Sequence, residues 1–232
     1  MAKRKKHNRI LIIILKAVLI VFILTLMVIL PFRWIAPPIS SFIVQAEYSS
    51  SDKAHKEIKN EWIYWEEISP QMPIAVVASE DQNFPNHFGF DFESISEAIE
   101  KSGERQRGAS TITQQVVKNL YLWPGKSLFR KGIEAYLTLF VELLWPKKRI
   151  LEVYLNFAEF GPGIYGVEAA SKLFWDKPAS ELTLQEASLL AAVLPNPNQR
   201  SPVDPSEYVI ERADWIAREV EQLGGKEYLE NL

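Results

Sequence analysis

Two adjacent carboxylates, Glu80 and Asp81, follow an apolar run from Ile74 to Ala78 that is preceded by Pro73. Because proline is favoured in the first turn of a helix, this pattern predicts a short buried helix with both acids near its C-terminal end. The helix dipole is negative there, and burial disfavours the charged form of a carboxylate. Both effects raise a carboxylate pKa, which suits proton transfer, although acid pairs at helix ends also occur in solvated loops.

A second polar segment runs from Gly108 to Leu120, and Ser110 is predicted to be the N-cap of a helix within it. The helical period places four polar side chains on one face of this helix: Thr111, Gln114, Gln115 and Lys118. A stripe of this kind is most often a solvated surface. The alternative is a hydrogen-bonding wall for a sugar or a phosphate.

A third cluster lies on a predicted long helix from Leu128 to Trp145. Arg130 and Lys131 stand four and three residues before Glu134, so the three side chains share a face. The simplest interpretation is a surface salt bridge worth a few tenths of a kcal/mol. The functional interpretation is a carboxylate beside two cations that could receive a pyrophosphate.

The N-terminus predicts a membrane anchor. Residues 1–9 form a basic tail, and residues 10–30 are apolar except for Lys16 and Thr25, long enough for the roughly 20 residues that a bilayer requires. An aromatic and basic stretch follows in place of a small-residue cleavage site, so we expect a retained single span with its basic flank in the cytoplasm. Residues 31–60 are predicted to be a connector and residues 61–232 a single folded domain.

Composition excludes several classes of protein. The chain has no cysteine, which rules out disulfides, thiolate metal sites and a cysteine nucleophile. The three histidines are too scattered for a histidine-rich metal site, and no metal ligands are predicted. After residue 33 the chain holds 19 basic and 29 acidic residues, a charge of −10 that argues against a nucleic-acid binder.

The remaining patterns predict a domain that is almost entirely α-helical. Asp91 is predicted to cap a helix that begins at Phe92, and residues 102–108 to form a loop. Further helices are predicted at 150–156, 167–175, 184–194 and 206–223, the third opened by a capping box from Thr183 to Glu186. The apolar loop from Tyr121 to Gly125 is either a flap that touches lipid or a buried corner. No alternating strand pattern is visible.

Taken together, these segments resemble glycosyltransferase family 51, which polymerises peptidoglycan, in its monofunctional membrane-anchored form. The resemblance spans about Glu80 to Pro202 and rests on four motifs in order. The first motif, acid-acid-x-x-Phe-x-x-His-x-Gly-x-Asp, is met by Glu80, Asp81, Phe84, His87, Gly89 and Asp91. The second, Gly-Gly-Ser-Thr-Ile-Thr-Gln-Gln, is met by Gly108 and by Ser110 to Gln115, with Ala109 replacing a glycine. The third and fourth are met by Arg130, Lys131 and Glu134, and by Ile150, Leu151, Glu152, Tyr154, Leu155 and Asn156 with the Gly-rich loop that follows.

The resemblance implies a mainly α, lysozyme-like helical glycosyltransferase domain that uses lipid II, a disaccharide-peptide on undecaprenyl pyrophosphate. It implies that Glu80 is the general base toward the acceptor GlcNAc 4-hydroxyl. Glu134 would be a second catalytic carboxylate that holds the cations or binds a metal-bridged pyrophosphate. The implied substrate-binding residues are Asp81, Ser110, Thr111, Gln114, Gln115, Lys118, Arg130 and Lys131. No cofactor is required, although a divalent cation, magnesium or manganese, could assist.

The implied location is the bacterial cytoplasmic (inner) membrane, with the N-terminus inside and the catalytic domain on the outer face. The expected partners are lipid II, the nascent glycan strand, membrane lipid, and proteins of cell-wall synthesis or division, and no nucleic acid is expected. No transpeptidase activity is expected, because Ser50 to Lys53 is an isolated Ser-x-x-Lys match and no Lys-Thr-Gly motif is present.

Two other functions compete with this interpretation. A lytic enzyme that cuts peptidoglycan would use one carboxylic acid of raised pKa, sometimes with a second carboxylate, but would have no use for Arg130 and Lys131 as a pyrophosphate site. A non-enzymatic membrane scaffold for cell-wall assembly would explain the anchor but not the ordered motifs.

Overall fold

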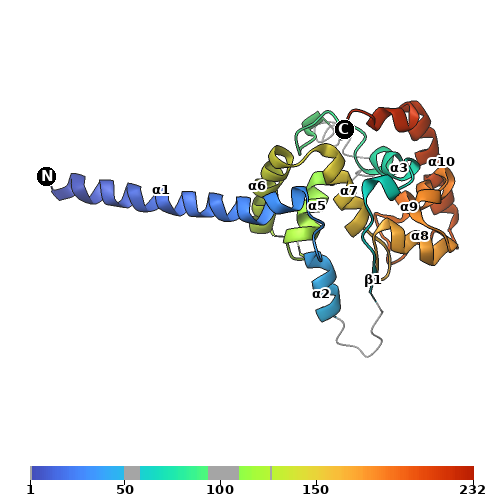
Figure 1. Cartoon of the computed structure of the whole chain (residues 1–232), viewed down its shortest axis with the longest axis horizontal. Coiled ribbons are helices and arrows are strands. Elements are labelled where there is room, and N and C mark those ends of the chain that lie inside the picture. The colour runs from blue at the N-terminus through green and yellow to red at the C-terminus, as the bar shows by residue number, and fades with distance from the viewer. Residues whose placement is uncertain (1, 50–57, 94–109, 126) are drawn as a thin grey trace.

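The computed structural model describes residues 2–49, 58–93, 110–125 and 127–232, and helices dominate these ranges (Figure 1). They are α1 (Ala2–Ile29), α2 (Ser41–Ser49), α3 (Gln71–Glu80), α5 (Ile112–Tyr121), α6 (Leu128–Leu144), α7 (Lys147–Phe157), α8 (Val167–Trp175), α9 (Leu184–Val193) and α10 (Glu207–Gln222). The prediction of a mainly α chain is confirmed. The predicted helix after Asp91 begins at Phe92 as expected, and Phe92 and Glu93 are helical, but the rest of it lies outside the described residues. The predicted loop at 102–108, and Gly108 and Ala109 of the second motif, also lie outside them.

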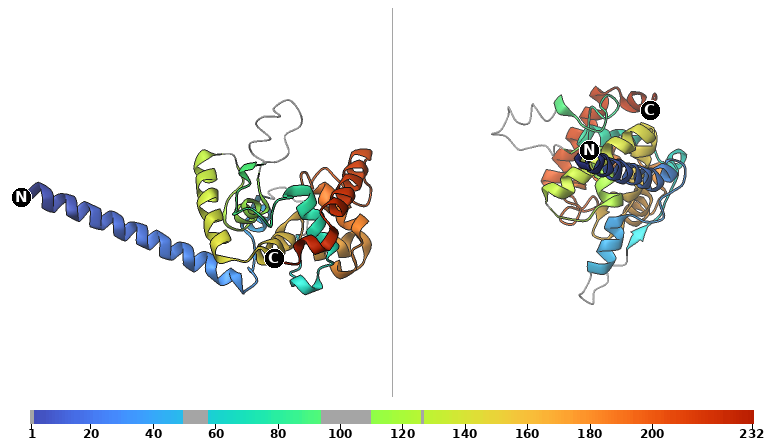
Figure 2. Two further views of the ribbon diagram at one scale, coloured as in Figure 1. Left: turned by 90° about the horizontal axis from the view of Figure 1, so that it is seen from above. Right: turned by 90° about the vertical axis from the view of Figure 1, so that its left-hand side faces the viewer.

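Helix α1 projects away from the other helices (Figures 1 and 2). The stretch from Asn8 to Arg33, which takes in most of α1 and the 3-10 turn that follows it (Leu30–Arg33), is long and apolar enough to cross a membrane. Most of its large apolar side chains have no protein cover, so a bilayer is the environment that would bury them. The structure therefore supports a single-pass membrane anchor.

The last turns of α1 dock on α6. Phe22 and Phe140 are in edge contact, with ring centroids 5.8 Å apart, and the Thr25 and Tyr136 hydroxyls lie 3.1 Å apart. At the end of the helix, the Trp145 indole donates a hydrogen bond of 3.0 Å to the carbonyl of Ile29. This contact gives the carbonyl at the end of α1 a side-chain donor from the C-terminal end of α6, and it ties the anchor to the domain.

A buried arginine fixes the chain that leaves the anchor. Arg149, on α7, donates to the carbonyls of Phe32 at 2.9 Å and Ile35 at 2.8 Å. A third donor of the same guanidinium meets the Glu152 carboxylate at 2.9 Å, and the guanidinium plane lies over Trp62 at 5.1 Å. The planar fork of arginine makes these simultaneous contacts possible, and we call this arrangement the Arg149 latch.

Helix α3 lies at the centre of the core. Every residue from Met72 to Ala78 is buried, which is the pattern of a helix covered on all sides. It packs against α9 and α10, whereas α5 packs against α6 and α7. The predicted short buried helix before Glu80 is confirmed, and it ends where these two groups of helices meet.

A small sheet accompanies the helices and was not predicted. Strands β1 (Lys59–Asn60), β2 (Glu159–Gly161) and β3 (Ile164–Tyr165) pair in the order β1-β3-β2, with β1 parallel and β2 antiparallel to β3. Strands of two or three residues are too short to show an alternating pattern in the sequence. Strand β1 places the last residues of the predicted connector in the domain's sheet.

The Arg149 latch gives a stability prediction. Arg149→Ala should lower the free energy of unfolding by about 3–5 kcal/mol, because it leaves the buried Glu152 carboxylate unpaired and frees two connector carbonyls. The measurement is the thermal unfolding midpoint of the full-length protein in detergent. Lys148→Ala, on the same helix, is the matched control, since its pair with Glu66 is exposed and worth about 0–1 kcal/mol. Equal midpoints for the two variants would contradict the latch.

Candidate active site

Glu80 is the last residue of α3, and its carboxylate is partly exposed. Burial raises its pKa above the ordinary value of 4.5, against the opposing effects of a hydrogen bond from Gln115 and the charges of Arg212 and Lys118. A carboxylate of raised pKa accepts a proton more readily than an ordinary one does. The direction predicted from the sequence is confirmed, and burial is its main cause.

Two neighbouring side chains orient this carboxylate. Gln115 donates from Nε2 to Oε2 of Glu80 at 2.9 Å, and the Tyr154 hydroxyl donates to Oε1 of Gln115 at 3.4 Å. Burial raises the pKa of Tyr154 well above 10, so its hydroxyl remains a donor at neutral pH. Among the described residues, none donates to the second oxygen of Glu80. That oxygen is therefore available to a substrate hydroxyl.

Asp81 joins the first motif to the start of α5. Its carboxylate contacts Nε2 of His87 at 2.9 and 3.0 Å, and its Oδ2 accepts the backbone N–H of Ile112 at 2.9 Å. The side chain is buried, and these partners occupy it. The geometry therefore favours a positioning role for Asp81 over the predicted contact with substrate.

Helix α5 begins one residue later than expected. Its N-cap is Thr111, not Ser110: the backbone N–H of Gln114 donates to Oγ1 of Thr111 at 3.3 Å, and the Gln114 side chain accepts the N–H of Thr111 at 3.0 Å. Thr111 Oγ1 also donates to the carbonyl of Gly89 at 2.8 Å. Thr111 and Gln114 are thus buried in a capping box, which accounts for them better than the predicted substrate contact does. Ser110 lies beside them and is partly exposed.

The predicted polar stripe on α5 is therefore not one surface. Thr111 and Gln114 are buried, whereas Gln115 and Lys118 reach the partly exposed side where Glu80 lies. Neither interpretation proposed from the sequence describes all four residues, because Thr111 and Gln114 are buried in the capping box.

Arg130, Lys131 and Glu134 form a compact cation cluster on the first turns of α6. Arg130 donates to Oε2 of Glu134 and to the carbonyl of Gly125, both at 2.8 Å, and the Lys131 ammonium pairs with Oε1 of Glu134. Glu134 is only 3% exposed, so this is not the surface salt bridge of the simplest interpretation. Two cations held by one carboxylate leave a net positive charge available to an anion.

Lys118 lies between the cluster and Glu80. Burial lowers the pKa of its ammonium, and Glu134 and Glu80 oppose this effect while Arg130 and Lys131 add to it. No carboxylate among the described residues forms an ion pair with Lys118. A partly buried cation without a counter-ion is a suitable receptor for an anionic ligand.

Sequence analysis missed three side chains that bear on the site. Tyr154 belongs to the fourth motif but was given no role. Arg212, on α10, donates to the carbonyl of Ser79 at 3.1 Å and contributes positive charge near Glu80. Phe42, on α2, faces Lys118. Arg212 and Phe42 lie far from the motifs in the chain, and no local pattern marks them.

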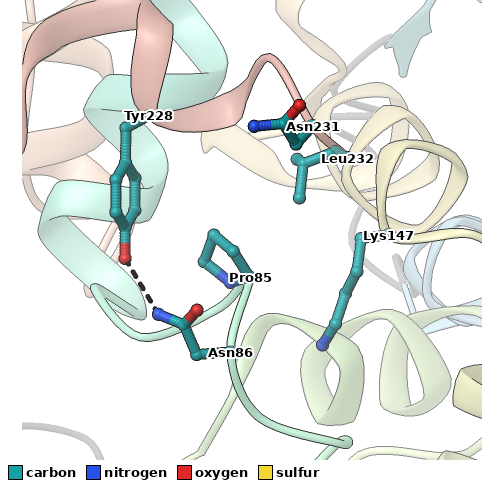
Figure 3. Close-up of a pocket in the computed structure, with 6 residues that line it drawn as sticks. All are labelled: Pro85, Asn86, Lys147, Tyr228, Asn231 and Leu232. Atoms are coloured by element: carbon teal, nitrogen blue, oxygen red, sulfur yellow. Dashed lines mark hydrogen bonds between the residues drawn. The ribbon is translucent and has the colours of Figure 1, made fainter.

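A cavity of about 330 Å³ lies beside the loop of the first motif but is separate from these residues (Figure 3). It is lined by Pro85, Asn86, Lys147, Tyr228, Asn231 and Leu232. The Lys147 ammonium pairs with Glu142 at 2.9 Å, which neutralises the one cationic side chain in the lining. Because Glu80 and the cation cluster do not line this cavity, we do not assign the active site to it.

The chain thus combines a helix that could anchor it in a membrane with a carboxylate of raised pKa and a nearby cluster of cationic side chains. The transglycosylase family model matches residues 47–221, and the chain belongs to this family. The predicted resemblance is confirmed.

Proteins described as biosynthetic peptidoglycan transglycosylases are similar to the chain over most of its length. The protein of Pectobacterium carotovorum is 49% identical over 222 residues, which cover 94% of this chain and 91% of the relative. That of Marinomonas sp. is 50% identical and covers 89% and 88% of the two chains. That of Escherichia coli is 48% identical and covers 90% and 92%.

Gly89 gives a second prediction. Its φ is +77°, and a Cβ would lie 2.7 Å from Thr138 Cγ2 and 2.9 Å from Glu142 Cγ, two side chains of α6 that are themselves held by hydrogen bonds. Gly89→Ala should therefore destabilise the protein by about 1–3 kcal/mol and displace the first motif. The measurements are the unfolding midpoint and the activity of the full-length enzyme.

Gly132→Ala is the control, since no atom lies within 4 Å of the added methyl group on α6. This helix-interior change should be neutral or stabilising by up to about 1 kcal/mol. If Gly89→Ala behaved like Gly132→Ala, the close approach of the first motif to α6 would not constrain the site.

Proposed function

We propose that this protein polymerises the glycan strands of peptidoglycan from lipid II and has no transpeptidase activity. The observation that carries the proposal is the environment of Glu80: one carboxylate oxygen is held by Gln115, the other accepts no hydrogen bond from a described residue, and the charge of Lys118 acts on the carboxylate. A base for a sugar hydroxyl and a receptor for a pyrophosphate are the two groups that this transfer needs.

In the proposed reaction, Glu80 removes the proton from the 4-hydroxyl of the acceptor GlcNAc. The hydroxyl oxygen forms a bond with C1 of the donor MurNAc, and the bond from C1 to the pyrophosphate oxygen breaks. The electron pair leaves with undecaprenyl pyrophosphate, and the configuration at C1 is inverted. Because the leaving group is already stable as an anion, catalysis depends more on stabilising negative charge than on a strong general acid.

Lys118, Arg130 and Lys131 supply that stabilisation in the proposal. Lys118 has no carboxylate partner among the described residues, and Arg130 is fixed at both Gly125 and Glu134, so neither cation needs a large rearrangement to meet a phosphate. A cation that is already in position needs little reorganisation when negative charge develops on the leaving pyrophosphate in the transition state.

Glu134 acts in the proposal by positioning these cations. Each of its oxygens already accepts a hydrogen bond from a cationic side chain, so it is poorly suited to bind a divalent cation. The described residues contain no group of three or more acidic or histidine side chains that could hold a metal ion. We therefore do not propose that Glu134 binds a metal ion in this reaction.

The apolar surface beside the site suits a substrate with a lipid tail. Helix α6 exposes large apolar side chains on the side that also carries the docked anchor, namely Leu128, Phe129, Leu139 and Leu143, and Trp34 and Ile35 are exposed next to the anchor. Leu128 and Phe129, 93% and 74% exposed, stand directly before Arg130. We propose that this surface enters the outer leaflet of the cytoplasmic membrane, with the basic N-terminal tail inside.

The site argues against the two rival functions. A lytic enzyme has no use for a cluster of cations that could receive a pyrophosphate, whereas Arg130 and Lys131 are held together here by Glu134. A scaffold has no use for a partly exposed carboxylate of raised pKa together with a lysine that forms no ion pair with a described carboxylate.

The direct test is incubation of the detergent-solubilised protein with labelled lipid II. Lysozyme-sensitive polymer and undecaprenyl pyrophosphate are the expected products, and Glu80→Gln should abolish both because an amide cannot accept the proton. Release of muropeptides from sacculi without polymer would instead establish a lytic enzyme. A fully active Glu80→Gln variant would remove Glu80 as the base.

Glu80→Gln should also leave the protein as stable as the wild type or more stable at neutral pH. A folded-state pKa above the unfolded value of 4.5 means that ionised Glu80 destabilises the fold at high pH, and that this cost disappears as the pH falls toward 4.5. The unfolding midpoints of the two proteins should therefore converge at acidic pH. A variant that is less stable at neutral pH would show that Glu80 has a structural role.

Gln115 gives a prediction about the pH profile of the reaction. Its hydrogen bond lowers the pKa of Glu80, so Gln115→Leu should move the acidic limb of kcat/KM to higher pH. Tyr154→Phe should shift it in the same direction by less, since it only frees the amide of Gln115 to reorient. Gln222→Leu, at an exposed position on α10, is the control. A changed KM with an unshifted limb would mean that Gln115 contacts substrate without tuning Glu80.

A further inference from the structure

Helix α2 connects the anchor region to the catalytic domain, and its first six residues precede the part of the chain that matches the family model. It packs against the end of α5 and is seen below that helix in Figure 1. Its side chains make specific contacts there, so α2 is more than a spacer.

Two polar side chains of α2 cap the C-terminal end of α5. Ser41 donates through its hydroxyl to the carbonyl of Asn119 at 3.1 Å and also contacts the carbonyl of Leu122. Gln45 donates to the same Leu122 carbonyl at 3.1 Å. Carbonyls at a helix C-terminus have no partner within the helix, and α2 supplies donors from a distant part of the chain.

These carbonyls belong to the segment that positions the cations. The N–H of Leu122 donates to the carbonyl of Lys118 at 3.2 Å. Three residues further on, the carbonyl of Gly125 accepts the hydrogen bond from Arg130. By fixing Asn119 and Leu122, α2 holds the end of α5, the helix that carries Lys118.

A third side chain of α2 reaches Lys118 directly. The ammonium lies over the Phe42 ring, 5.6 Å from its centroid, within the range of a cation–π contact. Such a contact attracts the cation without cancelling its charge, whereas a carboxylate in the same place would neutralise it. Phe42 therefore holds Lys118 in position while its full positive charge remains available to a ligand.

We propose that α2 is a wall of the donor site, in which Phe42 positions Lys118 for the pyrophosphate of the lipid-linked donor. This inference rests on the proposed function, because it assumes that Lys118 meets the pyrophosphate. Phe42 acts through Lys118 and is a positioning residue. The connector that follows the anchor thus forms part of the site that receives the lipid-linked substrate.

The experiment compares Phe42→Leu with Phe42→Tyr in the full-length enzyme, with lipid II as substrate. Leucine keeps apolar volume but has no aromatic face, whereas tyrosine keeps the face. Phe42→Leu should raise KM about three- to tenfold with a smaller effect on kcat, and Phe42→Tyr should stay near the wild type. Tyr48→Ala, at a position on α2 that is 85% exposed, is the matched control and should change neither value.

A structural role is separated from this one by a double-mutant cycle and by unfolding midpoints. In a Lys118→Met background, Phe42→Leu should have no further effect on KM, because its route to the substrate is already lost. A wild-type KM for Phe42→Leu, or an equal effect of that change in both backgrounds, would overturn the inference while leaving the proposed function intact. A wild-type KM for Lys118→Met would remove the lysine from the proposed donor site itself.

Discussion

The buried carboxylate of Asp81 is the contact on which the geometry of the site depends. It accepts the first backbone N–H of α5 and contacts His87, so it joins the end of one helix, the loop that follows, and the start of the next helix. A carboxylate at a helix N-terminus is favoured by the helix dipole as well as by the hydrogen bond. Because Glu80 precedes Asp81 in the chain, this contact also sets where Glu80 lies relative to Gln115 and Lys118.

Different environments give the carboxylates of the site different tasks. Asp81 and Glu134 have their oxygens occupied by donors or cations, and we assign both to holding other groups in place. Glu80 has one oxygen in a hydrogen bond and the other available, and burial raises its pKa. Glu80 has the fewest partners of the three and is therefore the one that can exchange a proton with a substrate. Chemically similar side chains thus serve as the base and as the residues that position other groups.

Much of this arrangement could be predicted from the sequence where local rules decide it. The helices α6, α8, α9 and α10 follow from apolar periodicity, and the capping box of Thr183 is present as expected. The same rule was not applied to Thr111, where Gln114 three residues later gives an equivalent signal, so two buried capping residues were assigned to the substrate. Phe42 and Arg212 could not be found in this way, because only the tertiary fold brings them to Lys118 and to the end of α3.

The attachment of the anchor follows from what the proposed reaction requires. An enzyme acting on a lipid-linked sugar must keep its base at a fixed height above the bilayer, because the lipid tail fixes the height of the scissile bond. A flexible tether would not provide this. Here the anchor docks on α6, the Arg149 latch holds the chain that follows, and α2 caps the helix that carries Lys118. In each of these contacts, a donor from the catalytic domain or the connector satisfies a backbone carbonyl. A series of specific hydrogen bonds therefore connects the membrane anchor to the site.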